Sequence, residues 1–164
     1  MPITDKFFAI NIRKYLALGD DHEAGESALI QLLSGFSCPK NPDVEHFLKK
    51  NAIEFTKKNQ SVTYLVFSKD NGEMLGYFTL ALKPLTIRGE TVSNTTKRKL
   101  LRVSELDVKS DTYTMSAYLI AQLGKNYADG RNREIAGKEL IELAWMIIEK
   151  TQYMFGGMVT FLEA

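Results

Sequence analysis

"NREIAGKELIELAW" (residues 132–145) leads from a turn directly into an amphipathic helix, and a long apolar strand at 111–128 precedes it. Its apolar residues recur at the three- and four-residue spacing of a helix face, so a helix is predicted over 134–150. The order strand, turn, helix predicts free backbone N–H groups at the helix start, where the helix dipole attracts anions such as phosphate. A last strand at 157–163 follows, so the two strands should be parallel with a right-handed crossover.

The first part of the chain predicts one strand and two helices. The strand is expected at 7–18, where apolar residues alternate, and a short helix is expected around 27–33. A longer helix is expected from Asn41, which suits the N-cap position, with Pro42 in the first turn.

Residues 61–82 give the clearest local signal, which is that of a hairpin. Two apolar, β-rich runs are joined by Asp70, Asn71 and Gly72, and an Asn-Gly pair supplies the positive φ angles of a tight turn. The following residues 83–106 predict a loop with one helical turn at 95–101. This order of elements predicts a mixed sheet with helices packed on it, in the α+β class.

Composition indicates a soluble globular protein with a single domain, residues 1–164. The net charge of +1 gives no overall electrostatic support for a nucleic-acid or membrane partner. Cys38 is the only cysteine, which excludes an internal disulfide framework and fits a reducing cytoplasm. No apolar run approaches the roughly 18–20 residues of a membrane span, and the N-terminus lacks a signal-peptide cleavage site. A cytoplasmic location is therefore expected.

Residue types that carry catalysis or bind metals do not form a recognisable set. No G-x-G-x-x-G, Walker or G-x-S-x-G motif occurs, and His22 and His46 lack metal-ligand spacing, so no metal is expected. Cys38 is expected to be structural because no partner histidine can be assigned. Glu163, near the carboxyl end of the last strand, is the one candidate for a catalytic base, with a merely exposed strand end as the alternative. A small basic cluster, more simply a solvated loop surface, consists of Lys97, Arg98, Lys99 and Arg102.

The glycine in the opening stretch has two interpretations. Gly137 and Ala136 leave room for a large group to approach the backbone, and Arg131, Arg133 and Lys138 add positive charge at the same place. An anion site at the helix start is one interpretation. The other is an ordinary helix start, where a small residue permits close packing against the sheet.

Four segments of the chain form a set with a recognisable order. They are "FSCPKNPDVEHFLKKNAIEF" (36–55), "YLVFSKDNGEMLGYFTLAL" (64–82), "YLIAQLGKNY" (118–127) and "NREIAGKELIELA" (132–144). Together they resemble the GNAT superfamily of acetyl-CoA-dependent N-acetyltransferases, and in particular its bacterial branch of toxins from toxin–antitoxin pairs. They occur in the family's order and cover most of the chain. The resemblance implies a mixed central sheet flanked by helices, acetyl-CoA as cosubstrate and a primary amine as acceptor.

The resemblance also implies which residues bind the cofactor. The main-chain groups of Leu123, Gly124 and Lys125 would pair with its pantetheine arm. Aligned on Gly137, the loop whose backbone N–H groups hold the pyrophosphate comprises Asn132, Arg133, Glu134, Ile135, Ala136, Gly137 and Lys138. The loop of the family has the pattern Gln/Arg-x-x-Gly-x-Gly/Ala. Gly137 matches the last of its three signature positions, whereas Asn132 stands in place of the Gln/Arg and Ile135 in place of the first glycine. The β-branched side chain of Ile135 is expected to restrict how closely the cofactor approaches.

The implied reaction is direct transfer of the acetyl group to a deprotonated amine, with Glu163 as the candidate base acting through water. The oxyanion would be held by a backbone N–H in a bulge near Leu123 to Lys125. The cofactor would enter a splayed gap between strands 113–124 and 157–163.

The resemblance does not extend to the C-terminal elements of the family's fold. In the family, the last strand seen here is followed by a helix, which carries a tyrosine that protonates the CoA thiolate, and by two more strands. None of these can be matched, so strand 157–163 is expected to offer a free edge to a second copy or a partner chain, beside open apolar surface. The alternatives are an active acetyltransferase and an inactive GNAT-fold module that binds CoA or protein. The near-neutral charge gives little support to an aminoacyl-tRNA acceptor.

Overall fold

The computed structural model describes residues 2–18, 22–157 and 159–162. In chain order its helices (α, and η for 3-10 helices) and strands are α1 (Ile3–Lys6), β1 (Phe7–Asn11), α2 (Arg13–Leu16), α3 (His22–Ser34), α4 (Pro42–Lys50), α5 (Ala52–Lys57), β2 (Val62–Ser68), β3 (Met74–Arg88), η1 (Gly89–Thr91), α6 (Asn94–Leu100), β4 (Glu105–Asp107), β5 (Thr112–Lys125), η2 (Ala128–Arg133), α7 (Gly137–Phe155) and β6 (Val159–Leu162). Among these described elements, no helix combines the length and the apolar character that crossing a membrane requires.

The strands form one six-stranded sheet. Its order is β1-β2-β3-β5-β4, and β6 also pairs with β5. Every pair is antiparallel except β5 and β6, which are parallel as the strand–helix–strand order predicts. The mixed sheet and the α+β class are therefore confirmed.

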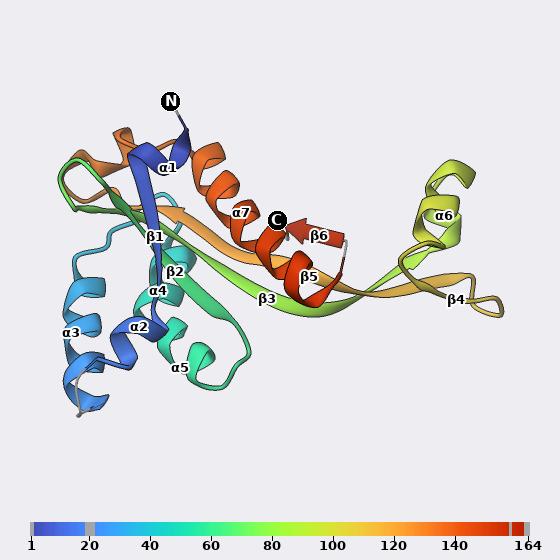
Figure 1. Cartoon of the computed structure of the whole chain (residues 1–164), viewed down its shortest axis with the longest axis horizontal. Helices are drawn as coiled ribbons and strands as arrows, with labels where there is room; N and C mark the ends of the chain where they lie inside the picture. Colours follow the sequence, from blue (N-terminus) through green and yellow to red (C-terminus); the bar gives the residue numbers. More distant parts are fainter. Residues whose placement is uncertain (1, 19–21, 158, 163–164) are drawn as a thin grey trace.

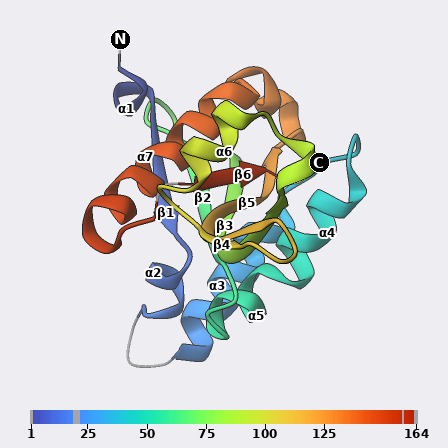
Figure 2. The ribbon, with the colours of Figure 1, turned by 90° about the vertical axis from the view of Figure 1, so that its right-hand side faces the viewer.

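Helices cover both faces of the sheet (Figure 1), and a separate hydrophobic core lies between the strands and the helices on each face. Helices α2 to α5 pack on one face around Leu29, Leu48 and Leu65, which we call the first core. Helices α1 and α7 cover the other face, where Phe78 and Leu140 belong to the second core. The view along the sheet shows α7 on one side of the strands and α3 to α5 on the other (Figure 2).

The predicted hairpin is present, but its turn differs from the expectation. Strands β2 and β3 pair in antiparallel register, with a register shift between Val66 and Phe67. Within the turn only Gly72 takes a positive φ, of 71°, so the expectation of a positive φ at Asn71 is wrong. The connection is longer than a two-residue turn, and the Asn71 side chain instead accepts a hydrogen bond from the backbone N–H of Glu73 at 3.0 Å.

Strands β3 and β5 extend beyond the body of the molecule as a two-stranded arm (Figure 1). The prediction of a loop throughout 83–106 is therefore wrong at its start, since β3 continues to Arg88. The helical turn predicted at 95–101 is confirmed as α6, which begins after Ser93, whose side chain accepts the backbone N–H of Thr96. Figure 2 looks along the arm from its tip, with α6 and β4 facing the viewer.

Three other expectations about element length and burial are corrected. The first strand ends at Asn11 instead of continuing to residue 18, because α2 begins at Arg13. Helix α7 starts at Gly137 rather than 134, because η2 and a short connection precede it. Helix α7 is also less buried than its wide apolar arc suggests, since Ile141 and Trp145 are 42% and 41% exposed.

Candidate functional site

One edge of β5 is open where the strand approaches the start of α7. Strand β6 pairs with β5 only from Ala117 to Ile120. Over the next residues, Ala121 to Lys125, no described strand lies on that side of β5, although β3 pairs along the other side. Among the described residues, the backbone groups of Leu123, Gly124 and Lys125 therefore have no strand partner on that side.

The irregularity in β5 does not lie where the sequence interpretation put it. Gln122 pairs with Thr79 and Ile120 pairs with Leu80, so Ala121 is the extra residue between them. The expectation of a bulge at Leu123 to Lys125 is therefore wrong by two residues. Gly124 serves another purpose, because a Cβ there would overlap Cγ1 of Val44 on α4.

Helix α7 begins with several unused backbone donors. The Ala136 N–H donates to Oε1 of Glu139 at 2.9 Å, and the Glu134 N–H donates to the Arg131 carbonyl at 3.0 Å. Within the described chain, no hydrogen bond involves the N–H groups of Ile135, Gly137 and Lys138. The loop expected to hold a pyrophosphate thus offers some of the predicted donors, whereas Glu134 and Ala136 already use theirs.

The side chain of Ile135 points away from these donors. It is only 3% exposed and belongs to the second core, where it packs with residues such as Leu140. The expectation that its β-branched side chain restricts an approaching ligand is therefore corrected, because that side chain is used in the core.

Gly137 is not explained by packing. A Cβ added there would meet no atom within 4 Å, and its φ is not positive. Neither close contact with the sheet nor backbone conformation therefore requires glycine, and the interpretation as a tightly packed helix start is wrong. The space above Gly137 is open, as an approaching ligand would need.

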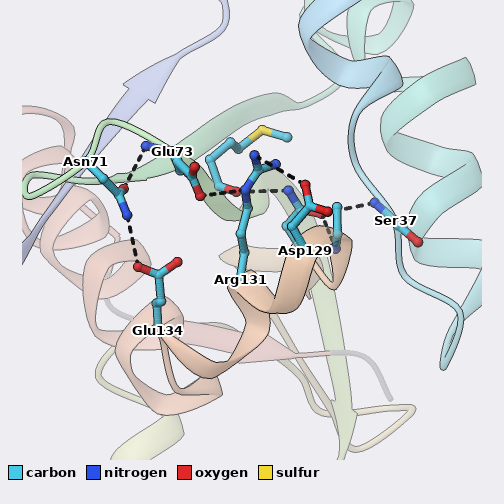
Figure 3. A network of polar contacts seen from close by, with 9 residues as sticks. Ser37, Asn71, Glu73, Asp129, Arg131 and Glu134 are labelled. Atoms are coloured by element: carbon cyan, nitrogen blue, oxygen red, sulfur yellow. Dashed lines mark hydrogen bonds and ion pairs between the residues drawn. The ribbon is translucent and has the colours of Figure 1, made fainter.

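The charges around the loop divide into paired and unpaired groups. The Arg131 guanidinium donates to a carboxylate oxygen of Glu73 at 2.8 Å, and Asp129 lies 3.9 Å away (Figure 3). The hydrogen bond to Glu73 is the main reason that the pKa of Arg131 is raised. By contrast, Arg133 and Lys138 are exposed and form no ion pair in the described part of the chain. These two cations remain available at the helix start, and Asn132 lies half-buried beside them in η2.

The sequence interpretation missed the residues that hold the loop in place. Asn126 is fully buried at the end of β5. Asn71 donates from Nδ2 to Oε1 of Glu134 at 3.1 Å, so the hairpin turn contacts the loop directly (Figure 3). A polar residue at the end of an apolar strand is a weak signal, but it is the signal by which Asn126 could have been noticed.

Of the other sequence candidates, Glu163 falls outside the described residues. Cys38 is buried and its backbone N–H donates to Oε1 of Glu45 at 2.7 Å, in keeping with the expected structural role. His46 is exposed on α4, and no group of potential metal ligands occurs among the described residues. The basic cluster on α6 and just after it lies in the arm tip, away from α7 (Figure 1).

Cavities of about 240 and 500 Å³ flank the C-terminal half of α7, and neither contains a predicted site residue. The smaller one is walled by side chains such as Tyr64, Leu80 and Ile148. The candidate site is therefore an open strand edge beside an open helix start rather than an enclosed pocket.

The fold is shared with solved acetyltransferase structures. No protein-family model and no curated protein sequence matches the chain. A mutant of KacT superposes with a TM-score of 0.65 at 17% identity, covering 97% of this chain and 78% of that chain. AtaT complexed with acetyl-methionyl-tRNAfMet superposes with a TM-score of 0.60 at 15% identity, covering 96% of this chain and 78% of that chain. AtaTR bound with AcCoA superposes with a TM-score of 0.55 at 15% identity, covering 98% of this chain and 76% of that chain. The GNAT fold implied by the sequence resemblance is therefore confirmed.

Proposed function

We propose that this GNAT-fold chain binds acetyl-CoA and transfers the acetyl group to a primary amine. The observation that carries the proposal is the open β5 edge at Ala121 to Lys125 beside an α7 start with unused donors and no side chain at Gly137. A strand edge binds amide groups, and an open helix start binds phosphate. A cofactor with a peptide-like arm and a pyrophosphate needs both features side by side.

In this proposal each part of the cofactor has a protein counterpart. The backbone of Leu123, Gly124 and Lys125 pairs with the amides of the pantetheine arm. The N–H groups of Ile135, Gly137 and Lys138 hold the pyrophosphate, which helix α7 also attracts through its dipole. The side chains of Arg133 and Lys138 offset the remaining phosphate charge, and Asn132 borders the same site.

The chemical step needs few protein groups. The amine nitrogen attacks the thioester carbonyl, the carbon–sulfur bond breaks, and CoA leaves as its thiolate, which takes up a proton. A backbone N–H on the open β5 edge stabilises the developing oxyanion. Glu163 remains the proposed base, and general acid–base groups of this kind typically contribute about 10²–10⁴-fold.

For the acceptor we propose a chemical class, and for the partner we propose a surface of this chain. AtaT is known in complex with acetyl-methionyl-tRNAfMet, and another structure of AtaT contains the C-terminus of the antitoxin AtaR. For this chain we propose a primary amine, in a cytoplasmic protein whose residues 1–164 form one domain. A second copy or a partner chain would pair with the outer edge of β6, which has no strand partner on that side among the described residues.

A second candidate function is a module that binds CoA or a protein without transferring an acetyl group. The Glu139 carboxylate favours the form of this module that binds a protein, because an acidic group already accepts one N–H at the helix start, where an anionic cofactor would lie. Transfer activity is what separates the two functions.

Calorimetric titration with acetyl-CoA, followed by a thiol-release assay on a panel of amines, tests both candidates. Heat and thiol release are expected for the wild type. Arg133→Gln and Lys138→Gln should each weaken binding several-fold, and added salt should weaken it further, because both cations face phosphate. Lys50→Gln, which removes an exposed charge at the end of α4, is the matched control and should bind normally.

The outcomes distinguish the candidates clearly. An absence of heat would reject both cofactor-dependent functions. Heat without thiol release from any amine would reject the enzyme and retain the binding module. Equal weakening by Lys50→Gln would show that charge acts without regard to position, which would contradict the proposed phosphate site.

A further inference from the structure

Asn126 is a buried residue whose side-chain oxygen and nitrogen both have hydrogen-bond partners. It is 0% exposed and follows the last residue of β5. Its Nδ2 donates to the Met74 carbonyl at 2.9 Å, and its Oδ1 accepts the N–H groups of Ser37 and Ala128, both at 3.1 Å. Its backbone N–H donates to the Leu75 carbonyl at 2.8 Å. One residue thus joins β3, the loop between α3 and α4, and the loop that enters α7.

Two further contacts fasten the same loop farther along (Figure 3). Arg131 contacts Glu73 at 2.8 Å, and Glu134 contacts Asn71 at 3.1 Å. Together with Asn126, they attach the loop from residue 126 to 134 along the short segment 71–75. The loop is therefore held at its entry, middle and exit by one stretch of the hairpin.

These three contacts differ in how firmly they hold. The contact between Glu134 and Asn71 is exposed and the contact between Arg131 and Glu73 is only partly buried, so water competes with both. Asn126 is shielded from water, so its hydrogen bonds are stronger and each unsatisfied partner would be costly. The entry of the loop is thus its most firmly fixed point.

We propose that Asn126 is a positioning residue, which fixes the loop 127–136 so that the donors at Ile135, Gly137 and Lys138 face a cofactor phosphate. The role rests on the proposed function for its ligand, although the fixing of the loop is a property of the unliganded protein. Asn126 itself contacts no cofactor and acts only through the loop.

The chemistry of the position calls for an amide. The Met74 carbonyl needs a donor, and the N–H groups of Ser37 and Ala128 need an acceptor. Leucine has a similar volume and offers neither. An ionised aspartate can accept hydrogen bonds but cannot donate one. A protonated aspartate can also donate, and so could supply the hydrogen bond to the Met74 carbonyl.

Asn126→Leu and Asn126→Asp test the role, with Thr63→Val as the matched control. Thr63 is equally buried, and its hydroxyl lies 2.7 Å from that of Thr79 within the sheet. Losing this hydrogen bond should lower the stability of the fold without changing any contact of the loop. Amide hydrogen exchange of residues 127–136 without cofactor is measured alongside acetyl-CoA affinity. Asn126→Leu should speed that exchange and weaken affinity by at least about tenfold, whereas Thr63→Val should change neither.

Asn126→Asp adds a readout that a merely structural residue would not move. Its loop exchange and affinity, each relative to wild type, should recover on acidification over the pH range in which the new carboxyl group takes up a proton, because the protonated acid restores the missing donor. Recovery supports the positioning role. A flat ratio across that range overturns it.

The remaining outcomes separate this role from the proposed function. If wild type binds no acetyl-CoA, the proposed function fails, and the exchange data alone decide whether Asn126 fixes the loop. Wild-type loop exchange in Asn126→Leu overturns the positioning role. So does an affinity loss in Asn126→Leu that only matches the loss in Thr63→Val, because that result would reflect stability alone.

Discussion

Gly137 shows at the scale of one residue how stability and binding can be separated. A methyl group at this position meets no protein atom, and the backbone conformation suits any residue. Gly137→Ala is therefore expected to leave the free energy of unfolding unchanged or to raise it by up to about 1 kcal/mol, because alanine loses less backbone entropy on folding. The same methyl group should weaken acetyl-CoA binding, since it would stand where the proposed phosphate approaches.

Urea unfolding and acetyl-CoA titration of the same preparation measure both effects. Gly35→Ala is the control, because its added Cβ would be 3.6 Å from the Leu32 carbonyl oxygen, an ordinary contact, and it follows the end of α3 rather than standing at the start of α7. Undiminished affinity in Gly137→Ala would contradict the proposed use of the space above the helix start.

Glu45 links stability to pH at the scale of one carboxylate. Its pKa is lowered, chiefly because the carboxylate accepts the backbone N–H of Cys38 and also because Lys49 lies nearby. A carboxylate whose pKa is lower in the folded state stabilises the fold above its unfolded pKa, and that contribution disappears as pH falls through the folded value. The relevant window therefore begins near 4.5 and extends downward.

We expect Glu45→Gln to be less stable than wild type at neutral pH, with the difference shrinking as the solution is acidified below that value. Urea unfolding at a series of pH values, with both proteins in the same buffers, measures the difference. A difference that stays constant or grows on acidification would show that the Cys38 contact does not depend on the charge of Glu45.

At the scale of elements, local patterns predicted the strands and helices better than the contacts between them. The strand, turn and helix around Gly137 follow from spacing that is visible within about twenty residues of sequence. The direction of the Ile135 side chain does not, because it depends on the second core. The exposed face of α7 at Ile141 and Trp145 was missed for a related reason, since periodicity identifies an apolar arc but not what lies opposite it.

In the candidate site too, the local sequence predicts some features, whereas others depend on tertiary contacts. The donors at the start of α7 are predictable, because every helix start has unsatisfied N–H groups. The contacts of Asn126 with Met74 and Ser37 join residues 52 and 89 positions apart, and no local pattern encodes such pairs. The local sequence predicts Asn71 only as a turn residue, whereas its side chain contacts Glu134 in the structure, and only the tertiary arrangement reveals that contact.

At the scale of the whole molecule, the body and the arm have separate hydrophobic clusters. The body contains the first and second cores on opposite faces of the sheet, whereas the arm has a smaller cluster of Leu100, Tyr113 and Met115. The arm reaches the body mainly through the continuous strands β3 and β5 (Figure 1). A region with few buried apolar contacts opens at lower free energy than a densely packed one. The arm should therefore open locally while the body remains folded.

A matched pair of leucine substitutions tests this independence. Leu48→Ala, in the first core, removes a side chain that is 0% exposed and should lower the free energy of global unfolding by about 2–5 kcal/mol. Leu100→Ala, in the arm cluster, removes a side chain that is 9% exposed and should cost the body far less. In hydrogen exchange, Leu100→Ala should speed exchange within the arm and leave the body and acetyl-CoA affinity unchanged. Equal losses of global stability in the two variants would instead show that the arm and the body unfold as one cooperative unit.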